Sequence, residues 1–316
     1  MSSGIRKTGD ERPQQYNGDA SKEGVMVSAM SSTAQKLAKA LLHTGLSKRG
    51  QVSIDFAGSG RNTNGWGDFS EYVFVIFGTP GTTSQWGWRY QGWHASVHFT
   101  VDPSTDDVSL ASLPFVIGTD NMVASEEADD HARVIDYYAF KLMGTFTASQ
   151  RSKIVQGDNR PHSTHIGEFG TDAYTPTGAG DASRGVGYDE MTTAQQDAFQ
   201  DVLEQFAVFM APAIAEQRME VVGLQCAAFP KLMRFIWWGT TDVHGKGSHY
   251  FQLTGASFVA EATGDTRCST NKKCLHFHLS WQDVGGGNWG ENVESYLMTH
   301  LLEDIADGEI DDPFKI

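Results

Sequence analysis

Two pairs of histidines lie on strand-like segments of this sequence, and imidazole is a common ligand of transition metals. His276 and His278 are separated by one residue, and alternation along a β-strand points both to the same side. Segment 93–101 alternates in the same way, so His94 and His98 share its polar side. If the two polar faces meet, we expect a pocket lined by histidines.

A carboxylate is predicted near these histidines. Glu261 lies on the polar side of segment 258–262, opposite its apolar residues. Together with His94, His276 and His278 it forms a ligand set that suits zinc, iron, manganese or copper. We expect one transition-metal ion, iron, copper or zinc, with Glu261 as the fourth ligand or as a general base. The alternative is that these are solvent faces of amphipathic strands, on which histidine is a tolerated polar residue.

Other residues are candidates for acid–base chemistry or substrate binding. Imidazole is a common acid–base group in enzymes, so His249 is a candidate acid–base residue, with a structural histidine as the alternative. Arg89 offers a fork of donors and is a candidate anchor for a carboxylate or phosphate, with a surface arginine as the alternative. The remaining predicted substrate contacts are ring-bearing side chains near these positions: Trp86, Trp88, Trp93, His98 and Tyr250.

Composition restricts the possible partners. The chain has 316 residues, of which 40% are hydrophobic, so it can bury a large core. Its formal net charge of −15 argues against binding nucleic acid or an anionic membrane, and favours a small-molecule substrate. Apolar runs are too short to span a membrane, and no secretion signal opens the sequence. We therefore expect a soluble, cytoplasmic protein; oligomeric state stays open.

The cysteines resemble neither a disulfide framework nor a zinc signature. Cys226, Cys268 and Cys274 are odd in number and lack paired spacing. We expect reduced thiols, and the alternative is that Cys268 and Cys274 bridge the short loop between them under oxidising conditions.

Secondary-structure signals divide the chain into two strand blocks. Residues 1–25 form a predicted flexible polar tail, and residues 26–316 a single α+β domain. Strands are predicted in 72–101 and 233–281, with a mostly helical stretch between them. The fold class is therefore α+β, with a mostly antiparallel sheet built from strands of both chain halves and flanking helices. The unbroken apolar run 72–77 predicts a central strand.

Helix starts are marked by residues that cap a first turn. Capping boxes are predicted at Ser32 with Gln35, Thr147 with Gln150, and Thr192 with Gln195. Acidic residues in the first turn favour another helix over about 126–142.

Several of these motifs together are similar to those of an uncharacterised family. They are, in order, Phe77-Gly78-Thr79-Pro80, Trp86-Gly87-Trp88-Arg89, Gly92-Trp93-His94, His249-Tyr250, Glu261 and His276-Phe277-His278-Leu279-Ser280-Trp281-Gln282-Asp283. This order resembles domain of unknown function 3500 (DUF3500), over residues 70–101 and 233–300. Trp93 stands where the family has a first histidine, and Gln282 where it has arginine. The resemblance supports a site at His94, His276 and His278 without naming a reaction.

The leading functional hypothesis is a metal-dependent enzyme, an oxidoreductase, acting on a small organic substrate in a His-rich, Trp-lined pocket. A zinc-dependent hydrolase, in which Glu261 activates water, is the first alternative. A non-enzymatic small-molecule-binding protein is the second. A third is that the histidine-bearing faces are only hydrated and that function resides in an assembly surface.

Overall fold

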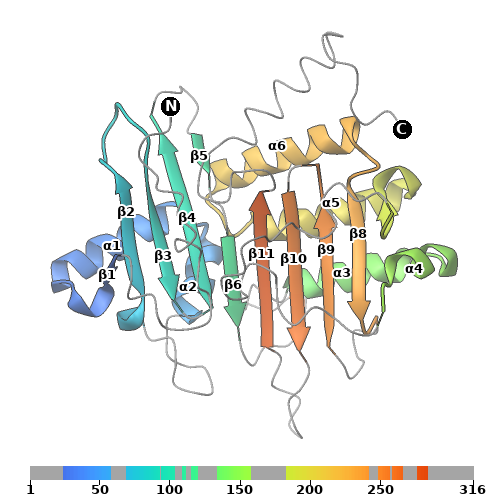
Figure 1. Cartoon of the computed structure of the whole chain (residues 1–316), viewed down its shortest axis with the longest axis horizontal. Helices are drawn as coiled ribbons and strands as arrows, with labels where there is room; N and C mark the ends of the chain where they lie inside the picture. The colour runs from blue at the N-terminus through green and yellow to red at the C-terminus, as the bar shows by residue number, and fades with distance from the viewer. Residues whose placement is uncertain are drawn as a thin grey trace, which may run out of the picture.

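Strands from both halves of the chain form one sheet in the computed structural model (Figure 1). The structure describes residues 24–57, 69–92, 94–103, 109–111, 115–119, 134–157, 183–241, 248–256, 258–265 and 276–283. The predicted tail, residues 1–25, falls almost wholly outside these ranges. Within them, no helix is long and apolar enough to cross a lipid bilayer.

The sheet has 11 strands, and the ladders between its named strands are antiparallel. The strands are β1 (Val25–Met26), β2 (Val73–Gly78), β3 (Trp86–Gly92), β4 (Ala95–Asp102), β5 (Ser109–Ala111), β6 (Phe115–Thr119), β7 (Val186–Gly187), β8 (Arg234–Gly239), β9 (His249–Thr254), β10 (Phe258–Asp265) and β11 (His276–Asp283). Their order is β1-β2-β3-β4-β6-β11-β10-β9-β8-β7, with β5 paired to β4. The chain halves meet where β6 pairs with β11, which confirms the predicted α+β class.

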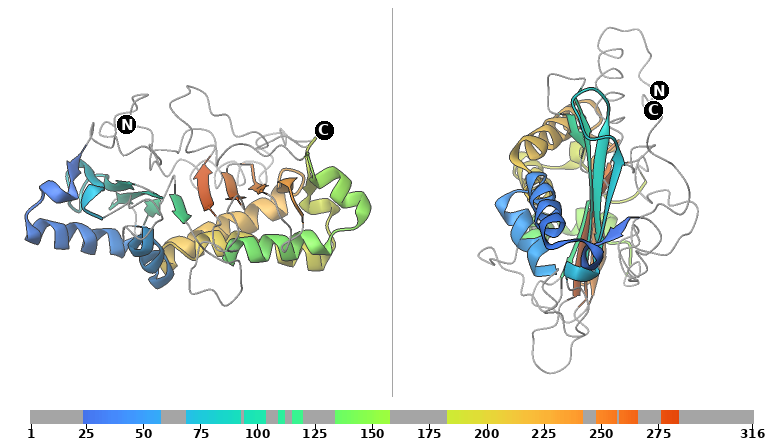
Figure 2. Two further views of the ribbon diagram at one scale, coloured as in Figure 1. Left: turned by 90° about the horizontal axis from the view of Figure 1, so that it is seen from below. Right: turned by 90° about the vertical axis from the view of Figure 1, so that its left-hand side faces the viewer.

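Helices of the described residues lie on one face of this sheet (Figure 2). They are α1 (Ser32–Thr44), α2 (Lys48–Ala57), α3 (Val134–Thr145), α4 (Ala148–Ile154), α5 (Thr193–Ala207) and α6 (Pro212–Ala228), with short 3-10 turns η2 (Val27–Ala29), η3 (Phe69–Glu71) and η6 (Tyr188–Glu190). We call the sheet face beneath these helices the helix face, and the opposite one the polar face.

Local capping explains where several helices begin. Thr147 and Thr192 each form a capping box with the glutamine three residues later, as predicted. The prediction for α1 was wrong by one residue, because Ser31 rather than Ser32 accepts the bond from Ala34 N. Of the predicted helix over 126–142, α3 contains the part from Val134 onward, and 126–133 lie outside the described residues.

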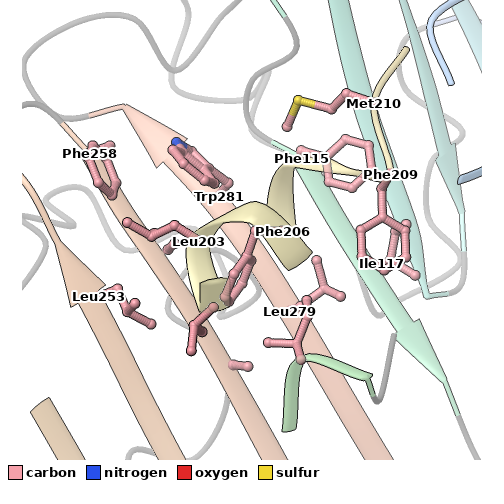
Figure 3. Packing of buried hydrophobic residues seen from close by; sticks show 14 of the residues in the cluster. Phe115, Ile117, Leu203, Phe206, Phe209, Met210, Leu253, Phe258, Leu279 and Trp281 are labelled. Atoms are coloured by element: carbon pink, nitrogen blue, oxygen red, sulfur yellow. The ribbon is translucent and has the colours of Figure 1, made fainter. Parts of the chain in front are cut away.

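The core fills the space between the helix face and α3, α5 and α6. Phe206 of α5 meets Trp281 of β11 edge-on, at a ring-centroid distance of 6.3 Å (Figure 3). It meets Phe251 of β9 in the same way at 6.5 Å. Phe115 of β6 lies 6.2 Å from Phe209. One hydrophobic cluster therefore spans the junction between the two halves of the sheet.

The prediction that residues 72–77 form a central strand was wrong. β2 lies next to last in the sheet, and β1 pairs only with Val73 and Phe74. Beyond that pairing Ile76 is 47% exposed. Central strands are often apolar runs, but an apolar run does not itself specify how many neighbours the strand has.

Candidate functional site

The polar face is buried although the described helices lie on the other side of the sheet (Figure 2). Strand alternation places polar side chains here from five strands. They are Arg89 and Gln91 of β3, His94 just before β4, Ser96, His98 and Thr100 of β4, Tyr250, Gln252 and Thr254 of β9, Glu261 and Thr263 of β10, and His278 and Ser280 of β11. Buried polar groups are costly unless they are satisfied by partners, so this concentration marks a candidate functional site.

His94 and His278 lie together on this face. Their ring centroids are 5.2 Å apart with an interplanar angle of 59°, and both residues are at most 5% exposed. His94 has a φ of 59°, a left-handed conformation that is uncommon outside glycine. Its carbonyl accepts a bond from Gly118 N at 2.7 Å, which ties it to β6.

Gly118 makes room for the two rings. It pairs with His278 across the β6–β11 ladder. A Cβ atom at Gly118 would lie 2.5 Å from His278 Cδ2 and 2.8 Å from His94 Cδ2. The absence of a side chain therefore allows both imidazoles to approach over the β6 backbone.

Glu261 is the centre of a second cluster. Its Oε1 accepts a bond from Ser280 Oγ at 2.9 Å, and its Oε2 accepts one from the Tyr250 hydroxyl. The Tyr250 oxygen accepts in turn from Gln252 Nε2 at 2.5 Å. Each of these four residues is 0% exposed. The register explains the cluster, because Glu261 stands opposite Gln252 on β9 and Ser280 on β11.

Arg89 and His98 form a third group at the β3–β4 end of the polar face. They are cross-strand neighbours, and the Arg89 guanidinium lies 5.6 Å from the centre of the Phe77 ring. Burial lowers the pKa of His98 well below its usual value, and the Arg89 charge lowers it further. His98 is therefore neutral at physiological pH.

His249 lies on the helix face, away from Glu261 and Tyr250. Its Nε2 is 2.8 Å from Asp136 Oδ1 of α3, and both residues are buried. The ring stacks on Trp237 at 5.4 Å and meets Phe140 edge-on at 4.8 Å. The structure thus does not bring His249 together with the other predicted catalytic residue, Glu261.

The tryptophans predicted to line the pocket do not lie together on the polar face. Trp88 stacks on Phe99 at 4.9 Å in the core, and Trp86 packs against Trp88 at 5.5 Å, so both belong to the helix face. Trp93 lies outside the described residues. Among the described tryptophans, Trp238 of β8 borders the Glu261 cluster, with its ring centroid 5.2 Å from that of Tyr250. The prediction that Trp86 and Trp88 line a site together with Arg89 is therefore wrong, because alternation sends Arg89 to the face opposite them.

The predicted metal ligands are only partly brought together. Within the described part of the chain, no three histidine, cysteine or acidic side chains are grouped so that they could hold one metal ion. His94 and His278 form a pair, and Glu261 belongs to the neighbouring cluster. His276 is in β11, opposite Asp265 of β10, but its side chain is outside the described residues.

A comparison with known protein families gives a match over most of the chain. The family described as protein of unknown function (DUF3500) matches residues 7–291. The chain belongs to the DUF3500 family. This assignment confirms the resemblance seen in the sequence motifs, and every candidate residue named above lies within the matched range. No curated protein and no solved structure matches the chain.

Sequence reasoning missed several residues that complete the site of this DUF3500 protein. Gly118, Gln252, Ser280 and Trp238 contact the predicted residues directly. Ser280 and Gln252 each lie two residues from a predicted site residue on the same strand, so alternation alone offered a signal for them. Gly118 and Trp238 depend on pairing between distant strands, which one sequence does not reveal.

Proposed function

We propose that this DUF3500 protein is a metal-dependent enzyme that acts on a small organic substrate at the polar face. His94 and His278 are the core of the proposed metal site, and His276 is the proposed third ligand. Its place there rests on strand alternation. The ion is iron, copper or zinc.

The observation that carries the proposal is the 5.2 Å separation of the His94 and His278 ring centroids. Two imidazoles that bind one tetrahedral ion at the usual metal–nitrogen distance of about 2.0–2.1 Å place their ring centroids about 5 Å apart. The left-handed backbone at His94 adds support, since strained conformations of this kind are often retained at functional sites.

The neighbouring Glu261 cluster supports an enzyme over a purely structural metal site. His278 and Ser280 are two residues apart on β11, and Ser280 donates to Glu261. A carboxylate beside a metal site can act as a general base, which is the role proposed for Glu261 here. Because its two oxygens accept bonds from Ser280 and Tyr250, the proposed role of Glu261 is that of a base and not of a fourth ligand.

Metal analysis of purified variants tests the proposal. His94→Asn removes the imidazole while asparagine tolerates the left-handed φ, and His278→Gln removes the other ring. His43→Gln, on α1 beside Asp55, is the matched control. We expect about one metal ion per wild-type and control chain, and at least a tenfold loss in either site variant. Equal metal content in all four proteins, or none after reconstitution with iron, copper and zinc, would contradict the proposal.

The identity of the metal separates the proposed reaction classes. Iron or copper favours the oxidoreductase, which we take as the first class to assay, and zinc favours a hydrolase in which Glu261 activates water. A metal-free protein that still binds small organic molecules would favour a non-enzymatic binding protein.

A further inference from the structure

The hydrogen bonds that join Glu261, Tyr250, Gln252 and Ser280 run in one direction, toward the carboxylate. Gln252 Nε2 donates to the Tyr250 oxygen, Tyr250 donates to Glu261 Oε2, and Ser280 donates to Glu261 Oε1. A carboxylate that accepts from two hydroxyl groups is arranged as an ionised acceptor. The proton of Tyr250 therefore lies between its own oxygen and a base.

Glu261 itself is poorly placed to meet a substrate. Each of its carboxylate oxygens is engaged by a hydroxyl group. Tyr250 extends from β9 between Glu261 and the ring of Trp238, which borders the polar face. A proton can therefore reach Glu261 Oε2 through the Tyr250 hydroxyl.

Gln252 gives an independent sign of a ligand at Tyr250. Because Nε2 of this amide donates to Tyr250, the orientation of Gln252 is fixed and Oε1 points elsewhere. Oε1 is fully buried, and among the described residues it has no hydrogen-bond partner. A buried acceptor of this kind needs a donor, and a second donor group of a substrate bound beside Tyr250, distinct from the hydroxyl that loses its proton, would supply it.

We propose that Tyr250 is the catalytic residue that takes a proton from a hydroxyl-bearing substrate, and that Glu261 holds that proton. The substrate O–H bond breaks and its proton bonds to the Tyr250 oxygen. The original Tyr250 proton moves at the same time to Glu261 Oε2. The substrate becomes an oxyanion, Tyr250 stays neutral, and the negative charge of Glu261 is transferred to the substrate. Gln252 and Ser280 are positioning residues that keep the two acceptors in place.

This inference deepens the proposed function, since it assigns a substrate class and a proton path to the same site. The His94–His278 pair and the Glu261 cluster are adjacent in the sheet. His278 pairs with Thr263, and Thr263 pairs with Tyr250. The Thr263 hydroxyl donates to the His249 carbonyl at 3.2 Å, so this residue lies between them with its proton already engaged. Proton transfer by Tyr250 and Glu261 does not itself require the metal, and the two proposals can fail separately.

A coloured phenol tests the proton path without a known substrate. The probe is 4-nitrophenol, which ionises near neutral pH and absorbs strongly only as the phenolate. Protein dialysed against a chelator is titrated with it in slightly acidic buffer. We expect the wild type to convert bound probe to the phenolate, and the phenolate band to fall at least fivefold in Tyr250→Phe and in Glu261→Gln. Both substitutions keep the size of the side chain.

Tyr188→Phe is the matched control, because Tyr188 also has a hydroxyl engaged by a glutamine, Gln200, but lies in η6 away from the polar face. It should behave as the wild type. No phenolate band with the wild type, or an equal band in Tyr250→Phe and Glu261→Gln, would overturn the assignment. If one variant fails to fold, as judged by its near-ultraviolet circular dichroism, the other carries the test. Metal analysis of the same proteins reports separately on His94 and His278.

Discussion

At the scale of single residues, the proximity of His94 and His278 depends on a missing side chain. Gly118→Ala would place a Cβ atom 2.5 Å from one ring and 2.8 Å from the other, so at least one imidazole must move. We expect metal affinity, measured by competition with a chromophoric chelator, to fall at least tenfold. Gly144→Ala is the control, since nothing lies within 4 Å of that added Cβ. Unchanged affinity in Gly118→Ala would show that this contact does not set the site.

The lowered pKa of His98 gives a residue-scale prediction about acid stability. In the folded chain burial and Arg89 keep His98 neutral, whereas the unfolded chain protonates it near its ordinary pKa of 6.5. The unfolded state therefore binds more protons below that pH, and this contribution to the free energy of unfolding decreases as the pH falls. Between about pH 7.5 and pH 5.5, urea unfolding of His98→Gln should lose less stability than the wild type. Equal losses would contradict the prediction.

Alternation predicted much of the site at this scale, because it is a local property of strands. It placed Glu261 on the side of segment 258–262 opposite the apolar residues, and the structure has this arrangement. The interpretation of Trp86 and Trp88 was wrong, because residues that are close in sequence were expected to line the same pocket. They were grouped with Arg89 as one pocket wall, although alternate residues of β3 face opposite sides of the sheet.

At the scale of elements, the caps that start helices make a measurable contribution. Thr192 begins α5, the helix that carries Phe206 into the core, through its bond with Gln195. Thr192→Ala should lower the free energy of unfolding by about 1 kcal/mol in urea denaturation. Thr193→Ala, in the first turn but without a capping bond, should change it by less than about 0.5 kcal/mol. Equal effects would mean that the capping box adds nothing.

Capping boxes and strand segments were predictable because their signals are contained within a few residues. Thr147 and Thr192 were predicted correctly, and β9 lies within the predicted strand block 233–281. The position of β2 in the sheet was not predictable, because strand order depends on pairing between segments far apart in the chain.

At the scale of the whole molecule, the proposed metal joins the two halves of the sheet. His94 precedes β4 in the first half, and His278 lies in β11 of the second, with β6 between them. A ligand that binds only the folded state stabilises it, by about 2.7 kcal/mol when its concentration is a hundred times its dissociation constant. Chelation should therefore lower the thermal midpoint of the wild type and of His43→Gln, and leave that of His278→Gln unchanged. An equal response in all three would contradict the link.

The two strand blocks were sufficient to predict an antiparallel sheet built from strands of both chain halves. The junction between β4, β6 and β11 did not follow from them, and it is this junction that brings His94 to His278. Its register rests on Ile117 and Leu279, which face the core together, and such nonlocal packing is not written in a single sequence.

X-ray absorption spectroscopy on the metal-loaded protein tests the central claim most directly, because it counts the imidazoles bound to the ion. We predict at least two imidazole ligands, at about 2.0–2.1 Å if the metal is zinc. His278→Gln should lose one of them, and His43→Gln should lose none. A spectrum without imidazole ligands, or one that is the same in the wild type and in His278→Gln, would contradict the claim that His94 and His278 hold the metal.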